Sequence, residues 1–215
     1  MTVTGAMAEI SIEQLIARAV PAIVGQAEAL TALDQAIGDG DHGINMKRGF
    51  EAIAEAAGDI AGQPFGAALQ KAGMTLVMKV GGASGPLYGS LLMAMGKAAA
   101  AQPDSAAALA AMLKEGIAAV KKRGKSEAGE KTMLDVLVPV QQALEALAQD
   151  GTTGAAAVAA VRAAADAGYE STRDMLATKG RASFLGERSV GHLDPGACSS
   201  RLLVQAVCDL VEEAV

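Results

Sequence analysis

Alanine-rich stretches are the feature of this sequence that most limits how it can fold. Residues 106–111 and 155–160 each hold five alanines, while only 2% of the 215 residues are aromatic. Alanine has the highest helix propensity, and the alternating β-branched or aromatic runs that strands need are scarce here. With 51% hydrophobic residues, the chain can also bury a substantial core. The sequence therefore predicts an all-α fold of closely packed helices, as one domain over residues 1–215.

Helical periodicity and capping signals divide the chain into about eight helices. Ser11 and Gln14 form a capping box before a long helical pattern that reaches Ile37, with Pro21 as a point where it can kink. The other helices are expected over 45–57, 65–79, 84–100, 105–124, 131–149, 153–178 and 195–215.

Glycine, aspartate and other polar residues gather between these helices rather than within them. The four clusters lie at 38–45, 81–86, 124–132 and 180–196. Loops held by a rigid scaffold are where binding and catalytic residues concentrate. We therefore expect the functional site in these loops.

Charge and targeting signals narrow the classes of partner. The formal net charge is −6 and no basic stripe is interleaved with aromatics, which argues against nucleic acid. The longest apolar stretch, 105–113, is too short to span a bilayer, and the first ten residues show no signal peptide, so no membrane partner is expected. Two cysteines, Cys198 and Cys208, fit small buried residues of a cytoplasmic protein.

The first polar cluster contains the glycine pattern of a dinucleotide-binding turn. Gly38, Gly40 and Gly43 form G-x-G-x-x-G. Such a turn must follow a strand, whereas the residues before this one have helical spacing. Two carboxylates inside the turn would also repel a pyrophosphate. The dinucleotide interpretation is therefore rejected.

Two other loop motifs fail as well. An EF-hand loop counted from Asp39 would need glycine where Ile44 stands and glutamate where Phe50 stands. A Walker A loop ending at 124–126 would need glycine where Ala119 stands, inside a predicted helix. Neither motif explains the glycines and aspartates.

Three carboxylates, Asp34, Asp39 and Asp41, lie within eight residues of one another. Adjacent carboxylates repel unless a cation neutralises them, and Mg²⁺ commonly joins a few carboxylates to substrate phosphates. His42 and Asn45 follow as side chains able to reach the same ligand. The alternative is that these aspartates are solvated turn residues or helix caps, a common role for aspartate. Local sequence leaves both interpretations open.

The other three clusters add groups that suit phosphates. In 81–86, consecutive glycines precede Ser84 at a helix start, which favours an anion, although Ser84 as an ordinary N-cap explains the same pattern. The charged residues of 121–135 are solvated by default, with phosphate contact as the alternative. The last cluster carries Arg181, Arg188, His192 and Asp194. Together the clusters favour a magnesium–nucleotide site and phosphoryl transfer, which needs mainly positioning and charge neutralisation.

Four segments carry a resemblance to a known family. Residues 33–50, 73–89, 123–140 and 179–197 resemble, in order and spacing, the nucleotide-binding subunits of dihydroxyacetone kinase, the family called DhaL. The resemblance covers nearly the whole chain. It implies an eight-helix antiparallel barrel with the nucleotide held in the loops at one end.

The resemblance also implies roles for individual residues. Asp34, Asp39 and Asp41 match the ligands of two Mg²⁺ ions that contact the phosphates. The residues that match nucleotide contacts are His42, Gly43, Ile44, Asn45, Ala83, Ser84, Gly124, Met133, Arg181, Asp194, Pro195 and Gly196. No catalytic side chain is expected in this chain, since the histidine that binds the sugar belongs to a partner subunit in this family.

The family's reaction would make this chain half of an active site. Bound ADP is phosphorylated by a phosphohistidine of DhaM, a protein of the phosphoenolpyruvate phosphotransferase system. The ATP formed then phosphorylates dihydroxyacetone held on DhaK. The sugar substrate would be set by DhaK, and a homodimer of this chain stays open.

Three alternatives remain at this level. The chain can be the nucleotide subunit of a kinase that exchanges free ATP and acts on another small ketose or polyol, such as erythrulose. It can be a non-catalytic module whose nucleotide shapes a docking surface. It can also be an alanine-rich structural bundle whose acidic turns are merely solvated.

Overall fold

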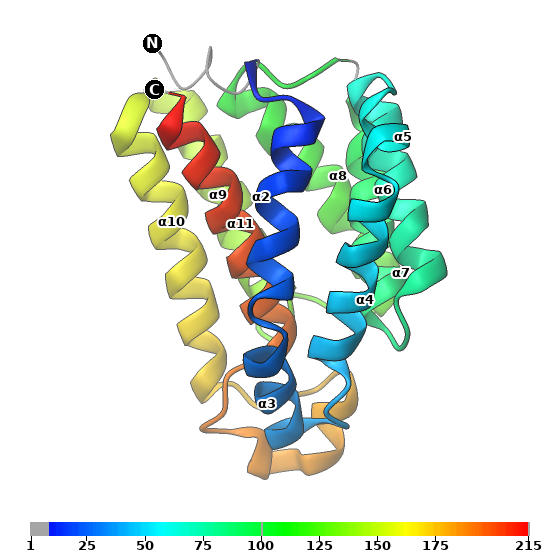
Figure 1. Ribbon diagram of the computed structural model, residues 1–215. Helices are drawn as coiled ribbons and strands as arrows, with labels where there is room; N and C mark the ends of the chain where they lie inside the picture. Colours follow the sequence, from blue (N-terminus) through cyan, green and yellow to red (C-terminus); the bar gives the residue numbers. More distant parts are fainter. Residues whose placement is uncertain (1–8, 100, 215) are drawn as a thin grey trace.

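The computed structural model describes residues 9–99 and 101–214, which form helices joined by loops, with no strand within these ranges (Figure 1). The α-helices are α2 (Ile12–Val24), α3 (Ala27–Ile37), α4 (His42–Glu55), α5 (Ala57–Ala61), α6 (Phe65–Lys79), α7 (Ser84–Ala98), α8 (Ala106–Gly124), α9 (Leu134–Asp150), α10 (Gly154–Ser171) and α11 (Pro195–Glu213). Two 3₁₀ segments, η1 (Thr172–Asp174) and η2 (Arg181–Ser189), lie between α10 and α11. The all-α prediction is confirmed.

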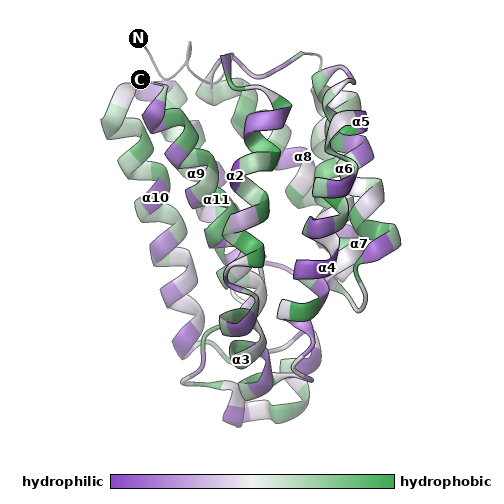
Figure 2. Ribbon diagram, viewed as in Figure 1, coloured by the Kyte–Doolittle hydropathy of each residue, from purple (hydrophilic) through white to green (hydrophobic). Residues whose placement is uncertain are grey.

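Within the part of the chain that the structure describes, eight long helices form a closed ring. Going round it, α2 contacts α4, then follow α6, α7, α8, α9, α10 and α11, and α11 contacts α2 again. Each helix runs antiparallel to its neighbours in the ring, while α3 extends α2 beyond the ring at the lower end of Figure 1. Apolar and hydrophilic residues alternate along the long helices, as expected when each buries one face (Figure 2). The predicted eight-helix antiparallel barrel is confirmed, with α3 and the one-turn α5 added to it.

The antiparallel order explains why the polar loops meet. Loops 38–41, 80–83, 125–133 and 172–194 each follow a helix that descends in Figure 1. In an up-and-down ring, every second loop lies at the same end. All four polar clusters identified in the sequence therefore share the lower end of the barrel.

The helix expected from Ser11 to Ile37 is broken. Its capping box is present, with Ser11 Oγ accepting from Gln14 N at 3.2 Å. The chain then bends by 52° between α2 and α3, where Gly25 ends α2 with its N–H bonded to the Pro21 carbonyl. Glycine's low helix propensity accounts for a break at this position rather than at the proline. Within the described residues no single helix could span a membrane; α2 and α3 reach that length and composition only as this bent pair.

Three other boundaries differ from expectation. Helix α4 begins at His42 rather than 45, and α9 begins at Leu134 rather than 131. Helix α10 ends at Ser171 instead of reaching 178, and the 3₁₀ segments follow it. In η2, Gly186 interrupts the helical backbone with φ +56. The last residues of the helices expected to end at 100 and 215 lie outside the described residues.

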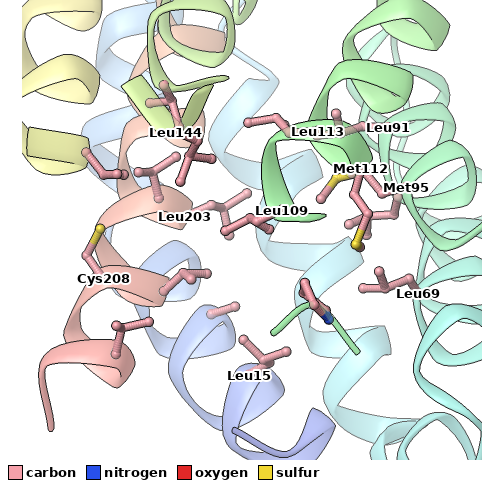
Figure 3. A pocket seen from close by; sticks show the side chains of 18 of the residues that line it. Leu15, Leu69, Leu91, Met95, Leu109, Met112, Leu113, Leu144, Leu203 and Cys208 are labelled. Carbon is pink, nitrogen blue, oxygen red and sulfur yellow. The ribbon is translucent and has the colours of Figure 1, made fainter. Parts of the chain in front are cut away.

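The barrel interior encloses an apolar cavity of about 500 Å³ (Figure 3). Its walls come from helices all round the ring and include Leu15, Leu69, Leu109, Leu144 and Leu203. An ionised phosphate in such surroundings would lose its hydration without gaining polar partners. The cavity therefore does not suit a nucleotide, and the chemistry must lie in the loops at the barrel end.

Candidate functional site

The three aspartates of the first polar cluster converge at the lower end of the barrel. Asp34 lies in the last turn of α3, while Asp39 and Asp41 lie in the loop before α4. One carboxylate oxygen of each lies within 4.8 Å of the others, with Asp34 buried and the other two exposed. Hard oxygen donors in this number and spacing suit Mg²⁺. The residues present therefore fit the predicted ion.

Asp34 also has a structural role. Its Oδ2 accepts hydrogen bonds from the backbone N–H groups of Asp41 at 2.8 Å and His42 at 3.0 Å, so it caps the start of α4 from a different helix. Its Oδ1 faces Gly38, where a Cβ would lie only 2.1 Å away. The capping and metal interpretations left open by the sequence are therefore compatible, because the cap uses Oδ2 and leaves Oδ1 available for a cation.

The glycine loop between α6 and α7 passes over the first turn of α4. A Cβ at Gly81 would lie 2.9 Å from Asn45 Oδ1, and one at Gly82 would lie 3.7 Å from Asp41 Oδ2. Gly82 has φ +64, a conformation that glycine adopts without strain. The N-cap of α7 is Ala83, so the interpretation of Ser84 as an ordinary N-cap is wrong. Glycine backbone beside a carboxylate cluster suits a phosphate that shares the cluster's cation.

His42 joins this loop to the other side of the site. Its Nδ1 lies 2.9 Å from Ser84 Oγ and its Nε2 lies 2.9 Å from Ser199 Oγ. Burial lowers the pKa of His42 more than the nearby carboxylates of Asp34 and Asp41 raise it. A neutral imidazole has one donor and one acceptor nitrogen, which matches two hydroxyl partners that can each take either role.

Tyr88 extends the network to the start of α11. Its hydroxyl lies 2.7 Å from Ser199 Oγ and 2.8 Å from Ser200 Oγ, and it donates to the Gly196 carbonyl at 3.1 Å. Burial raises the pKa of Tyr88, so the phenol stays protonated. Tyr88 and Ser200 also line the apolar cavity, so this network separates the cavity from the site. Tyr88, Ser199 and Ser200 were not among the predicted site residues; two consecutive serines one turn after Pro195 were the available signal.

Arg181 brings η2 to the carboxylates. Its Nε lies 3.0 Å from Asp39 Oδ2, and its side chain is 70% exposed. Exposed ion pairs of this kind contribute only about 0–1 kcal/mol to stability. The guanidinium is therefore held weakly enough to move to a phosphate, for which its planar fork is well suited.

A second group of predicted residues lies at the start of α11. Asp194 Oδ2 accepts from Ala197 N at 2.6 Å and so caps α11, with Pro195 in the first turn. A Cβ at Gly196 would lie 3.5 Å from Met133 N, which places the end of the 125–133 loop beside this turn. Burial raises the pKa of Asp194 to about 7.

Three predicted residues are placed differently from the rest. Gly43 is buried, and a Cβ there would lie 2.0 Å from the Ala27 carbonyl, so it allows α4 to pack closely on α3. Ile44 is 55% exposed on the first turn of α4. Gly124 ends α8, where a Cβ would meet Leu87 at 3.3 Å, one turn along α7 from the glycine loop. Their nucleotide contacts stay predictions.

Most of this chain matches a known protein family. The model of the DAK2 domain family matches residues 36–209. The ADP-binding subunit DhaL of PEP-dependent dihydroxyacetone kinase 1 from Listeria innocua is 48% identical over 180 residues, covering 84% of this chain and 85% of the relative. The corresponding DhaL subunit of Escherichia coli is 42% identical over 189 residues, covering 87% and 90%.

A solved structure shares the fold. The dihydroxyacetone kinase from C. freundii, in complex with AMP-PNP and Mg²⁺, superposes with a TM-score of 0.70 at 24% identity, over 92% of this chain. The match spans only 33% of the solved chain, so the present chain corresponds to about one third of that kinase.

Proposed function

This chain belongs to the DAK2 domain family, and from that membership and the geometry of its loops we propose that it is the ADP-binding subunit of a phosphoenolpyruvate-dependent dihydroxyacetone kinase. The observation that carries the proposal is the meeting of Asp34, Asp39 and Asp41 with the glycine loop 80–83 at one barrel end. Relatives that cover most of this chain bear that subunit's name.

In the proposed site the three aspartates hold two Mg²⁺ ions, and bound Mg²⁺ shields the phosphate charge. Loop 80–83 and the start of α7 bind phosphate oxygens through backbone N–H groups. Arg181 moves from Asp39 to a phosphate. The remaining predicted contacts, from His42–Asn45, Ala83–Ser84, Gly124, Met133 and Asp194–Gly196, surround the rest of the nucleotide.

The chain's own side chains position and neutralise charge, and the sugar is held elsewhere. A DhaK-type subunit would hold dihydroxyacetone, and a DhaM-type phosphohistidine protein would supply the phosphoryl group. A single domain over 1–215 and a cytoplasmic location belong to the same proposal. The exposure of Asp39 and Asp41 supports a role for such partners, because a phosphoryl-transfer site that is open to solvent needs a partner to exclude water.

The direct test is bound nucleotide. Native mass spectrometry of the purified chain should show one ADP with Mg²⁺, and Asp39→Asn should lose both. Asp104→Asn removes an exposed carboxylate outside the four polar loops and should retain them. Added Mg²⁺ and ADP should also raise the free energy of unfolding, by roughly 2.7 kcal/mol at a hundredfold excess over Kd. A chain whose melting temperature ignores both would be a structural bundle instead.

A reconstituted assay separates the remaining alternatives. Mixing the chain with dihydroxyacetone, a DhaK-type subunit and a phosphohistidine donor should yield dihydroxyacetone phosphate, and Asp39→Asn should abolish it. Equal product from both would point to a non-catalytic docking module. Product formed only when free ATP is supplied, after the nucleotide is lost on gel filtration, would point to an ATP-exchanging kinase.

A further inference from the structure

Lys131 is buried in a segment whose charges suggest a solvated loop. It is 1% exposed, and it is the largest of the fully buried side chains that the structure describes. Its backbone has φ +62, a left-handed conformation that a non-glycine residue adopts at a cost of about 1–3 kcal/mol. Burial of an ammonium group is also unfavourable unless its hydrogens are bonded. Something in the fold must offset both.

The ammonium group is surrounded by backbone carbonyls. Lys131 Nζ donates to the carbonyl oxygens of Thr172 and His192, to that of Met175 at 3.2 Å, and lies 3.5 Å from that of Arg173. Three of these four oxygens come from the segment that follows α10, and two of them have a further partner: the Thr172 carbonyl accepts from Met175 N at 3.3 Å and the Arg173 carbonyl from Gly191 N at 2.8 Å. We name these four oxygens the carbonyl cage.

Carboxylates near the Lys131 ammonium partly offset the cost of its burial. Burial lowers the pKa of Lys131, whereas the carboxylates of Asp194, Asp174 and Asp135 raise it and the Arg173 guanidinium lowers it. Asp135 in turn binds the loop, since its Oδ2 accepts from Thr132 N at 2.6 Å. The ammonium therefore lies in a pocket of carbonyl oxygens with carboxylates beyond them, the surroundings of a bound monovalent cation.

The cage connects the two segments that carry predicted nucleotide contacts. Lys131 is two residues before Met133, and His192 is two residues before Asp194. Thr172 adds a second connection, because its Oγ1 accepts from Asp194 N at 3.1 Å while its carbonyl accepts from Lys131. One ammonium thus ties the 125–133 loop, the end of α10 and the turn before α11 together.

We propose that Lys131 is a positioning residue whose ammonium acts as a built-in monovalent cation, holding Met133 and Asp194–Gly196 at the spacing that the nucleotide requires. The inference rests on the proposed function, because these residues are proposed nucleotide contacts. Carbonyl oxygens are also the ligands that coordinate K⁺ in proteins. An external cation should therefore replace the lysine head group.

The test is chemical rescue of Lys131→Gly, which removes the ammonium and relieves the left-handed backbone. In sodium buffer, calorimetry with Mg²⁺ should show the Kd for ADP raised about ten- to a hundredfold, the loss expected for charge-assisted hydrogen bonds. Butylammonium or K⁺ should restore most of the affinity. If the variant is unfolded in sodium buffer, recovery of its helical circular dichroism with either cation supports the cage, and no recovery overturns it.

Two further variants sharpen the result. Lys125→Gly is the matched control, since Lys125 lies in the same loop with φ +49 but is exposed; its ADP affinity should equal that of the wild type and ignore butylammonium. Lys131→Met fills the space without a charge, so its weakened ADP binding should resist rescue. A folded Lys131→Gly that binds ADP with wild-type Kd would reduce Lys131 to a purely structural role.

Different results would contradict the positioning role of Lys131 and the proposed nucleotide site. If wild type and Lys125→Gly both bind no ADP, the proposed nucleotide site is wrong. If both bind ADP and Lys131→Gly binds equally well without added cation, only the positioning role is wrong. A melting temperature of Lys131→Gly that is the same in sodium, K⁺ and butylammonium buffers overturns the cage in either case.

Discussion

His42 Nε2 lies 2.9 Å from Ser199 Oγ, and this contact joins the first turn of α4 to the second turn of α11. The other ring nitrogen contacts Ser84 at the start of α7. One buried imidazole therefore links the carboxylate and glycine loops on one side of the site to the α11 turn on the other. The site depends on this link, because its residues come from helices that are not all neighbours in the ring.

Replacing Ser199 with alanine should loosen that link. It leaves His42 Nε2 buried without its partner and removes one of the contacts of Tyr88, so the free energy of unfolding should fall by about 1–3 kcal/mol. The Kd for ADP with Mg²⁺ should rise, because His42 no longer fixes Ser84. Urea denaturation and calorimetry measure the two effects. Ser90→Ala on α7 should change neither, and an unaltered Kd in a destabilised Ser199→Ala would separate the network from nucleotide binding.

The two roles of Asp34 can be separated by a pair of substitutions. Asp34→Asn keeps an oxygen that can accept from Asp41 N and His42 N but loses the charge, so it should fold normally and lose the Mg²⁺-dependent rise in melting temperature. Asp34→Ala should lose both, with a further destabilisation of about 1 kcal/mol, typical for loss of a helix cap. Equal melting temperatures for the two variants without Mg²⁺ would mean that the cap contributes nothing.

Much of the architecture could be predicted because its causes are local. Alanine-rich helices separated by glycine and aspartate clusters predict a helical bundle with its site in the loops, and the resemblance to DhaL implies the antiparallel order in which alternate loops meet at one end. That is why Asp34, Asp39 and Asp41 were expected near the 81–86 loop and are found there. The resemblance to DhaL, made from four segments, is confirmed by the family match.

The features that could not be predicted from the sequence depend on contacts between segments that are distant in the chain. Helix α4 begins three residues early because Asp34 caps it from α3, which no local capping pattern signals. The sequence predicts solvation or phosphate contact for the charged residues of 121–135 and does not reveal that Lys131 is buried, because its burial depends on carbonyls 41 to 61 residues away. Likewise Tyr88 and Ser199 meet only because α7 and α11 approach each other at the end of the barrel.

Asp194 should make stability depend on pH. Burial raises its pKa from 3.8 to about 7 in the folded chain, so the native state binds the proton more tightly than the unfolded state. Its stabilising contribution is therefore full below pH 3.8 and is lost as the pH rises to about 7. Asp194→Asn keeps a cap acceptor for Ala197 N without a titrating proton. The free energy of unfolding of the wild type, relative to this variant, should fall between about pH 4 and pH 7.

The Asp194→Asn variant is needed as a reference because titration of His42 changes the free energy of unfolding in the opposite direction to titration of Asp194. Burial lowers its pKa below 6.5, so its protonation at low pH favours the unfolded state. Subtracting the Asp194→Asn curve from the wild-type curve removes this shared contribution. A flat difference across the range would show that Asp194 is ionised throughout.

Mg²⁺-dependent ADP binding should require glycine at position 38, because a side chain there would collide with Asp34. Gly58 is a matched control glycine. A Cβ at Gly38 would lie 2.1 Å from Asp34 Oδ1, the oxygen left for a metal, whereas a Cβ at Gly58 in α5 meets nothing within 4 Å. Gly38→Ala should push the Asp34 carboxylate aside and weaken Mg²⁺-dependent ADP binding, measured by calorimetry. Gly58→Ala should leave that Kd unchanged and stabilise the chain by about 0.5–1 kcal/mol, since alanine favours the helix. Wild-type affinity in Gly38→Ala would mean that Asp34 Oδ1 does not bind the metal, leaving Asp34 as a helix cap alone.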